Sequence, residues 1–137
     1  MNGGGSSPRF VLDASAVLAL LHDEPGGERV LPMLDGAAMS TVNWSEVLQR
    51  YEAEGLALDG RREQIESLGV ELRPFDARQA ELAAELYSAT RGTGLGIADR
   101  ACLALAIDLE AEAVTADRSW GGLEAPALSA VSVNVIR

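Results

Sequence analysis

Short apolar runs in this chain alternate with longer segments in which apolar residues recur at helical spacing. In segment 14–22, for example, Val17, Leu18 and Leu21 would share one helix face, and Asp76 precedes another periodic segment that it is expected to cap. The pattern predicts helices over 14–22, 28–34, 44–54, 61–68, 76–90 and 97–109, and strands over 9–13, 37–41, 70–73, 113–115 and 131–136. Strands separated by helices indicate crossover connections, and so an α/β fold of three layers, α/β/α, around a central parallel sheet.

The segments between these elements carry turn signals. Residues 23–27 contain Pro and two Gly and end the first helix, and the glycine-rich loop 91–96 leads into the helix that contains Asp99. Asn43 and Glu46 have the spacing of a capping box, which predicts that a helix begins there. Segment 117–122 reads as a turn or a short helix.

The 137 residues are enough for one domain with a real core, which we place at residues 9–137. Residues 1–8 are rich in Gly and Ser and are interpreted as a flexible tail, because they lack the apolar region of a secretory signal. No apolar stretch approaches the roughly 18 to 20 residues of a membrane span. We therefore expect a soluble cytoplasmic protein that makes no membrane contact.

The formal net charge of −10 argues against a protein that binds nucleic acid non-specifically, because such binding neutralises phosphates with a basic surface. Bound divalent ions would offset part of this charge. Every basic residue is an arginine. Arginine is the better partner for phosphates, although a GC-rich genome explains this composition more simply.

Four acidic residues stand where a parallel fold would bring side chains to one edge of the sheet. Asp13 and Asp117 directly follow apolar runs, and Glu46 and Asp99 lie in the opening turns of predicted helices. The carboxyl ends of parallel strands are where open α/β sheets bind their ligands. Four carboxylates that meet there would repel one another unless a hard divalent cation lay between them. The pattern therefore predicts a metal site.

Each acid also has a structural explanation. Asp13 is placed to cap the helix after it, Glu46 to complete a capping box, Asp99 to complement a helix N-terminus, and Asp117 to start a turn. The prediction of a site therefore depends on the coincidence of all four positions.

Two hydroxyl residues, Ser15 and Thr115, lie two positions from Asp13 and Asp117. They are candidates for holding a metal-bound water or a phosphate oxygen. Their structural alternatives are a residue in a first helical turn and a β-branched strand residue.

Several other distinctive residues are interpreted as structural. Cys102 lies in an apolar run and reads as a small core residue, and His22 reads as a partner of a helix C-terminus. Trp44 and Trp120 flank the proposed site, where they would either stack on a base or pack in the core, and packing is favoured. The arginines beside Asp99 and Asp117 would contact substrate phosphate or form solvated ion pairs.

At these residues the chain resembles the PIN-domain nucleases, and among them the VapC-type toxins of bacterial and archaeal toxin–antitoxin pairs. The resemblance covers nearly the whole chain outside the tail. Its motifs, in order, are segments 11–16, 23–26, 43–47, 96–100 and 114–120.

The resemblance implies a three-layer PIN-like domain with Mg²⁺ or Mn²⁺ at Asp13, Glu46, Asp99 and Asp117, and endonucleolytic cleavage of RNA. Metal-activated water would be the nucleophile and would leave a 5′-phosphate and a 3′-hydroxyl, which needs no histidine base. The resemblance also implies a small cognate antitoxin, a selective structured RNA substrate such as a tRNA, rRNA or mRNA, and homodimers.

Two alternatives stay open at this point. One is a catalytically silent PIN-like module that binds protein or RNA and keeps the acids for folding or partner contact. The other is a different Mg²⁺ enzyme, such as a phosphatase with Asp13 as its nucleophile. The second is disfavoured because no other Asp follows two residues after Asp13 and because the chain has no lysine to balance a phospho-aspartate.

Overall fold

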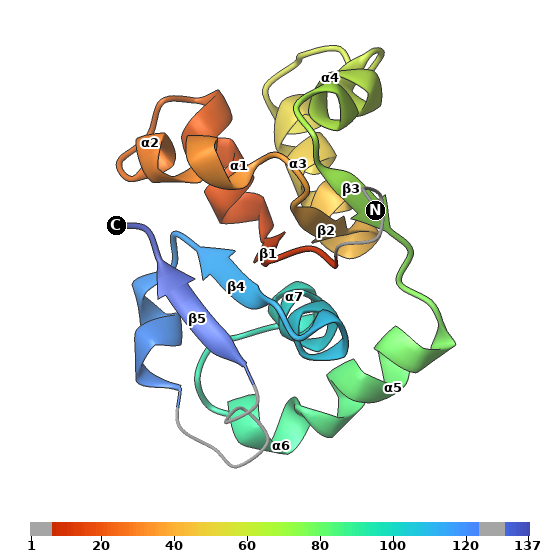
Figure 1. Cartoon of the computed structure of the whole chain (residues 1–137), viewed down its shortest axis with the longest axis vertical. Coiled ribbons are helices and arrows are strands. Elements are labelled where there is room, and N and C mark those ends of the chain that lie inside the picture. The colour runs from red at the N-terminus through yellow and green to blue at the C-terminus, as the bar shows by residue number, and fades with distance from the viewer. Residues whose placement is uncertain (1–6, 124–130) are drawn as a thin grey trace.

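The structure is a computed structural model that describes residues 7–123 and 131–137 (Figure 1). Residues 1–6 of the predicted tail lie outside the described residues. The strands are β1 (Phe10–Leu12), β2 (Ala38–Ser40), β3 (Glu71–Arg73), β4 (Glu112–Thr115) and β5 (Ser132–Val135). The helices are α1 (Ala14–Leu21), α2 (Gly27–Val30), α3 (Thr41–Ala53), α4 (Arg61–Ser67), α5 (Ala77–Glu85), α6 (Tyr87–Thr90) and α7 (Ile97–Leu109), with 3-10 helices η2 (Leu31–Met33) and η3 (Arg118–Gly122).

Among the described residues, five strands form one parallel sheet in the order β3-β2-β1-β4-β5. Val11 in the central strand pairs with Ala38 on one side and Ala113 on the other. The chain first moves outward from β1 through β2 to β3, then returns to the opposite side of β1 for β4 and β5. The order therefore reverses between β1 and β4, and such a switch point is where open α/β sheets form a ligand crevice.

Helices cover both faces of the sheet (Figure 1). Because side chains alternate along a strand, Leu12 and Val114 pack into a core with α1 to α4, whereas Val11 and Ala113 pack into a second core with α5 and α7. The predicted three-layer α/β/α fold is confirmed. No helix among the described residues combines the length and the apolarity of a membrane span.

Cys102, Trp44 and Trp120, which were interpreted as packing residues, lie as expected. Cys102 and Trp120 are buried in the core around α7, and Trp44 is buried in the core on the opposite face. His22 ends α1, where its backbone N–H donates to the Leu18 carbonyl at 2.8 Å. These four side chains contribute to the fold and do not line the site described below.

The predicted capping box at the start of α3 is wrong. The helix begins at Thr41, and Ser40, which ends β2 in extended backbone, is the cap because its hydroxyl accepts from the Val42 N–H at 3.2 Å. Ser40 precedes Asn43, and its hydroxyl already accepts from a free N–H of the first helical turn. The helix therefore starts before Asn43, which lies inside it. Asn43 is buried there instead of capping.

The single helix predicted over 76–90 is interrupted. It ends as α5 at Glu85, and the Leu86 N–H is shared between the carbonyls of Leu82 and Ala83 before α6 begins. This shared bond tightens the last turn of α5, as is common at helix ends. The predicted cap is confirmed, because Asp76 accepts from the Gln79 N–H at 3.0 Å.

Candidate active site

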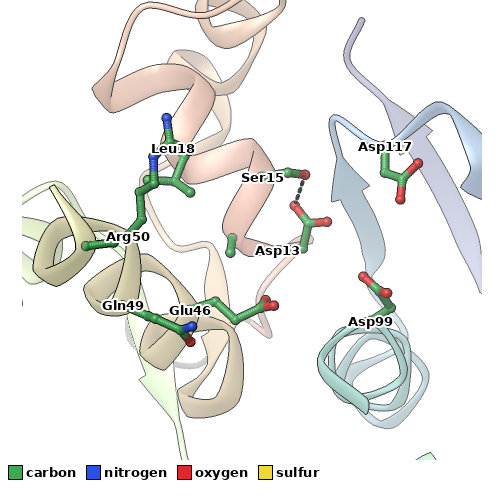
Figure 2. A pocket seen from close by; sticks show the side chains of 10 residues that line it. Asp13, Ser15, Leu18, Glu46, Gln49, Arg50, Asp99 and Asp117 are labelled. Atoms are coloured by element: carbon green, nitrogen blue, oxygen red, sulfur yellow. Dashed lines mark hydrogen bonds between the residues drawn. The ribbon is translucent and has the colours of Figure 1, made fainter. Parts of the chain in front are cut away.

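A cavity of about 460 Å³ opens at the switch point between β1 and β4 (Figure 2). All four predicted acids line it, although they lie far apart in the sequence: Asp13 follows β1, Glu46 comes from α3, Asp99 from α7, and Asp117 follows β4. The remaining lining residues are Ala14, Ser15, Leu18, Gln49, Arg50 and Ala53.

Asp13 is the buried acid of the cavity, with 4% of its surface exposed. One of its carboxylate oxygens accepts hydrogen bonds from Ser15 Oγ at 2.7 Å and from the Ala16 N–H at 2.8 Å, and the other accepts from Thr115 Oγ1 at 2.5 Å. Loss of hydration outweighs these bonds and raises the pKa of Asp13 from 3.8 to about 6. A nearby cation would reverse this shift.

The two hydroxyls predicted as supporting groups join the ends of β1 and β4. Thr115 Oγ1 accepts from the Asp117 N–H at 3.0 Å, Ser15 Oγ accepts from the Ala116 N–H at 2.9 Å, and the two hydroxyls lie 3.2 Å apart. Thr115 has no exposed surface, and it therefore acts on the cavity through its hydrogen bond to Asp13. Ser15 is partly exposed and itself lines the cavity.

Asp99 and Glu46 extend from helices and make fewer hydrogen bonds than Asp13. Asp99 Oδ2 accepts from the Gly96 N–H at 2.9 Å, and Glu46 Oε1 accepts from Asn43 Nδ2 at 3.4 Å. Loss of hydration raises the pKa of both side chains, and repulsion adds to it, from Asp117 on Asp99 and from Asp99 on Glu46. Since Asp99 also repels Asp13, it is the acid electrostatically coupled to the other three.

Asp117 is exposed at the start of η3, where its Oδ1 accepts from the Ser119 N–H at 2.9 Å and from Ser119 Oγ at 2.8 Å. The structural roles considered from the sequence for Asp13, Asp99 and Asp117 are therefore real. They coexist with positions in one shared cavity, so the structural and functional interpretations do not exclude each other.

Asn43 connects the helices that carry two of the acids, a role that its sequence motif did not reveal. Its Nδ2 donates to the Ala98 carbonyl at 3.0 Å as well as to Glu46, so it ties α3 to the first turn of α7. The spacing of three residues between Asn43 and Glu46 could have indicated their contact, because residues at this spacing lie on one helix face.

The donor set of the cavity fits a hard divalent cation by its chemistry, because carboxylate oxygens are the ligands that Mg²⁺ and Mn²⁺ prefer. In residues 7–123 and 131–137, no three acidic, histidine or cysteine side chains are grouped closely enough to hold an ion as they stand. The carboxylates repel one another and bond to their own neighbours instead. Ion binding would thus require side-chain rotation, for which exposed Glu46 and Asp117 have room.

Arg50 was not predicted as a site residue, yet it lines the cavity. It lies four residues after Glu46 on α3, a spacing that places both on one helix face. Arg100 and Arg118, the arginines that were considered as phosphate contacts, are not among the described lining residues. Arg100 donates to the Leu95 carbonyl at 3.3 Å and lies over the Tyr87 ring.

Comparison with known proteins gives one family match and several similar folds. The sequence model of the family described as PIN domain matches residues 10–124. No curated protein matches the sequence.

Three solved structures illustrate the likeness of fold. A toxin–antitoxin complex from Klebsiella pneumoniae matches with a TM-score of 0.68 and 17% identity, over 93% of this chain and 97% of that one. DNA-bound VapBC from Salmonella typhimurium matches with a TM-score of 0.64 and 18% identity, over 94% and 98%. A member of the VapBC family of toxin–antitoxin systems from Mycobacterium tuberculosis matches with a TM-score of 0.56 and 21% identity, over 94% and 100%.

Proposed function

This chain belongs to the PIN domain family, and from that premise we propose that it is a metal-dependent endoribonuclease that acts as the toxin of a toxin–antitoxin pair. The observation that carries the proposal is the gathering of Asp13, Glu46, Asp99 and Asp117 in one cavity at the switch point of the sheet. The toxin role is supported by the fold that the chain shares with proteins solved as toxin–antitoxin complexes.

Asp13, Asp99 and Asp117 are the residues that would hold Mg²⁺ or Mn²⁺, with Glu46 as a further ligand or as the group that positions water. A bound divalent cation supplies Lewis acidity at the phosphate and a water of lowered pKa. Asp13 is held rigidly by Ser15, Thr115 and the Ala16 N–H, so its carboxylate direction is set before substrate arrives. Rigid positioning of this kind is what lets a site stabilise a transition state without reorganisation.

The described lining of the cavity contains no histidine, and carboxylates are its acid–base groups. Glu46, exposed at the cavity mouth and with a raised pKa, is suited to orient water and to accept its proton. Cleavage of this type leaves a 5′-phosphate and a 3′-hydroxyl.

The net charge of the chain supports a selective substrate and a partner with a basic side chain. A net charge of −10 disfavours general attraction to polyanions, so we propose a selective structured RNA such as a tRNA, rRNA or mRNA. The same charge suits a small antitoxin that places a basic side chain at the acidic cavity. We further propose that the protein acts in the cytoplasm and forms homodimers.

The test is cleavage of total cellular RNA by wild-type protein and by Asp99→Asn, each with Mg²⁺, with Mn²⁺ and with EDTA. Discrete cuts that need metal and disappear in the variant would support the proposal. Widespread degradation would contradict selectivity, and cleavage that persists in EDTA would contradict metal dependence.

A second candidate is the catalytically silent module that binds protein or RNA. It is favoured by one observation: Asp13, Asp99 and Asp117 each complete a local hydrogen-bonding motif, and no three acids among the described residues are grouped as an ion site. Absence of cleavage by folded protein freed of any antitoxin, under every metal condition, would support this candidate.

A further inference from the structure

Arg50 is the one basic residue among the described residues that line the cavity. Figure 2 shows it on the side formed by α1 and α3, near Leu18, and across the cavity from Asp99 and Asp117. A nucleic acid that brings one phosphate to the acids must also place neighbouring phosphates along the cavity. The side that carries Arg50, across from Asp99 and Asp117, is therefore where a second negative charge of the substrate would lie, one helical turn beyond Glu46 on α3.

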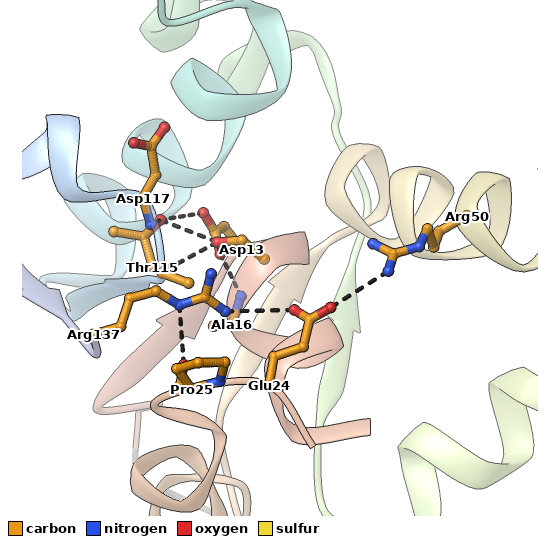
Figure 3. A network of polar contacts seen from close by, with 10 residues as sticks. Asp13, Ala16, Glu24, Pro25, Arg50, Thr115, Asp117 and Arg137 are labelled. Carbon is orange, nitrogen blue, oxygen red and sulfur yellow. Dashed lines mark hydrogen bonds and ion pairs between the residues drawn. The ribbon is translucent and has the colours of Figure 1, made fainter. Parts of the chain in front are cut away.

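Arg50 is held by two carboxylates that are not part of the acidic set, and Figure 3 shows its contact with one of them, Glu24. Its Nε donates to Glu54 at 2.6 Å, and its Nη2 donates to Glu24 at 3.4 Å. Among the described residues, Arg50 forms its ion pairs with Glu54 and Glu24 and not with the four acids of the cavity, so neutralising those acids does not explain its position.

Glu24 also contacts the C-terminal residue, Arg137. Its second oxygen accepts from Arg137 Nη2 at 3.4 Å, and Arg137 Nε donates to the Pro25 carbonyl at 3.0 Å (Figure 3). Gly26 allows this approach, because its φ of 89° suits glycine and a Cβ there would collide with the carbonyl oxygen of Ile136. Glu24 therefore bridges Arg137 and Arg50 and restrains the guanidinium at the cavity.

The restrained guanidinium still has hydrogen bonds to offer. Arginine carries five N–H donors, and within residues 7–123 and 131–137 the bonds to Glu54 and Glu24 use two of them and leave three. The Arg50 side chain is 41% exposed. A charged planar fork with free donors matches phosphate oxygens in two-point geometry.

We propose that Arg50 binds a backbone phosphate of the RNA next to the one that is cut, and that Glu24 is a positioning residue that holds Arg50 for this contact. This inference rests on the proposed nuclease function. A protein partner would have to place its own acidic side chain beside four carboxylates to use Arg50, whereas a nuclease substrate always presents neighbouring phosphates.

The experiment compares wild-type protein with Arg50→Gln, Arg50→Lys and Glu24→Gln, with Arg78→Gln as the matched control. Arg78 is also an exposed arginine paired with a carboxylate, Asp108, and it lies outside the cavity. For each protein, kcat/KM for a discrete cut in total RNA is measured at several salt concentrations with Mg²⁺. Binding of a fluorescently labelled RNA fragment that spans this cut is measured in EDTA.

We expect Arg50→Gln to lower kcat/KM about tenfold, mainly through KM, because one charged hydrogen-bonded contact is lost. The slope of log affinity against log salt should become less steep by about 0.7, the value of one phosphate on a single strand. Arg50→Lys should restore the slope but only part of the affinity, and Glu24→Gln should raise KM by a smaller factor. If Arg50 had only a structural role, Arg50→Gln would lower activity without changing the slope of log affinity against log salt.

If wild type cleaves and Arg50→Gln behaves like Arg78→Gln, this inference fails while the nuclease function stands. If Arg50→Gln keeps its RNA affinity and loses only inhibition by a co-expressed antitoxin, Arg50 contacts the partner protein and the inference is overturned. If wild type neither cleaves nor binds RNA, the proposed function fails as well.

Discussion

The two halves of the candidate site differ in how their carboxylates are held. The strand half, consisting of Asp13, Ser15 and Thr115, is formed where β1 and β4 end, and its carboxylate accepts three hydrogen bonds in a nearly closed environment. The helix half, consisting of Glu46 and Asp99, extends from α3 and α7 with one hydrogen bond to each carboxylate, from a side-chain amide to Glu46 and from a backbone N–H to Asp99. One half is therefore rigid before any ligand binds, and the other can adjust.

The difference has a physical origin. Asp13 directly follows β1, whose end is fixed by the sheet ladder, and is therefore buried among backbone groups, whereas Asp117 lies two residues beyond β4 and is exposed. An acid on a helix turn is fixed only by its own rotamers and cap contacts. Ion binding by this site is expected to move the helix half toward the strand half, and four predictions test that contrast.

The largest effect is expected from removing the charge of Asp99, which repels Asp13 in the strand half and Glu46 in the helix half. Asp99→Asn should reduce metal-dependent RNA cleavage at least about 10³-fold, because it removes the charge of a proposed metal ligand. The fold should persist, since the amide oxygen can still accept from the Gly96 N–H. Initial rates and thermal melting check this prediction, with Asp108→Asn on the same helix as the matched control. Retained cleavage in Asp99→Asn would exclude its role in the site.

Asp13 should make the metal-free protein less stable as the pH rises. Its pKa is raised in the folded state, from 3.8 to about 6, so between these values the folded chain binds more protons than the unfolded chain. The free energy of unfolding should then fall by about 3 kcal/mol in all between about pH 3 and pH 7, with about 2 kcal/mol of this between pH 4 and pH 6. Urea unfolding in EDTA measures this dependence.

The control for this pH dependence is Asp13→Asn, which should remove most of the fall, while Glu46 and Asp99 contribute the remainder with the same sign. A wild-type protein whose stability rises with pH over this range would contradict the assigned environment of Asp13.

Removing the Thr115 hydroxyl should loosen the strand half. Thr115→Val keeps the shape but removes the hydrogen bond to Asp13 Oδ2 and the acceptor of the Asp117 N–H, at a cost of about 2 kcal/mol. Cleavage should fall by about tenfold or more, as for other groups that orient ligands. Thr115→Ser retains the hydroxyl and should keep most activity. If both variants reduced cleavage equally, the role of Thr115 would be packing and not hydrogen bonding.

The smallest effect on stability is expected in the helix half. Glu46→Gln should change the metal-free stability by no more than about 0.5 kcal/mol, because the side chain is exposed and makes one long hydrogen bond. It should nevertheless reduce the rise in melting temperature that Mg²⁺ produces in wild type. Glu52→Gln, an exposed glutamate on the same helix, is the control. A full Mg²⁺ response in Glu46→Gln would remove Glu46 from the ligand set.

Much of the fold was predictable because apolar periodicity reports burial directly. Helix 97–109 and the apolar strand before Asp13 follow from the pattern alone, and so does the parallel sheet. The wrong predictions concern places where two local hydrogen-bonding arrangements were possible. Ser40 and Asn43 both offered a helix cap, and Leu86 lay within a periodic segment whose last turn tightened. Neither competition can be resolved from spacing, because the outcome depends on what each backbone N–H meets in the folded chain.

The sequence by itself determined the alternation of elements, and with it a parallel sheet whose strand ends carry Asp13 and Asp117. Only the tertiary structure decided that Asn43 bridges α3 to α7, that Thr115 is buried against Asp13, and that Arg50 lines the cavity between Glu24 and Glu54. The local sequence pattern shows which residues are buried on folding and with what periodicity they recur. Contacts such as Thr115 with Asp13 join residues about a hundred positions apart, and the order of strands in the sheet alone brings them together.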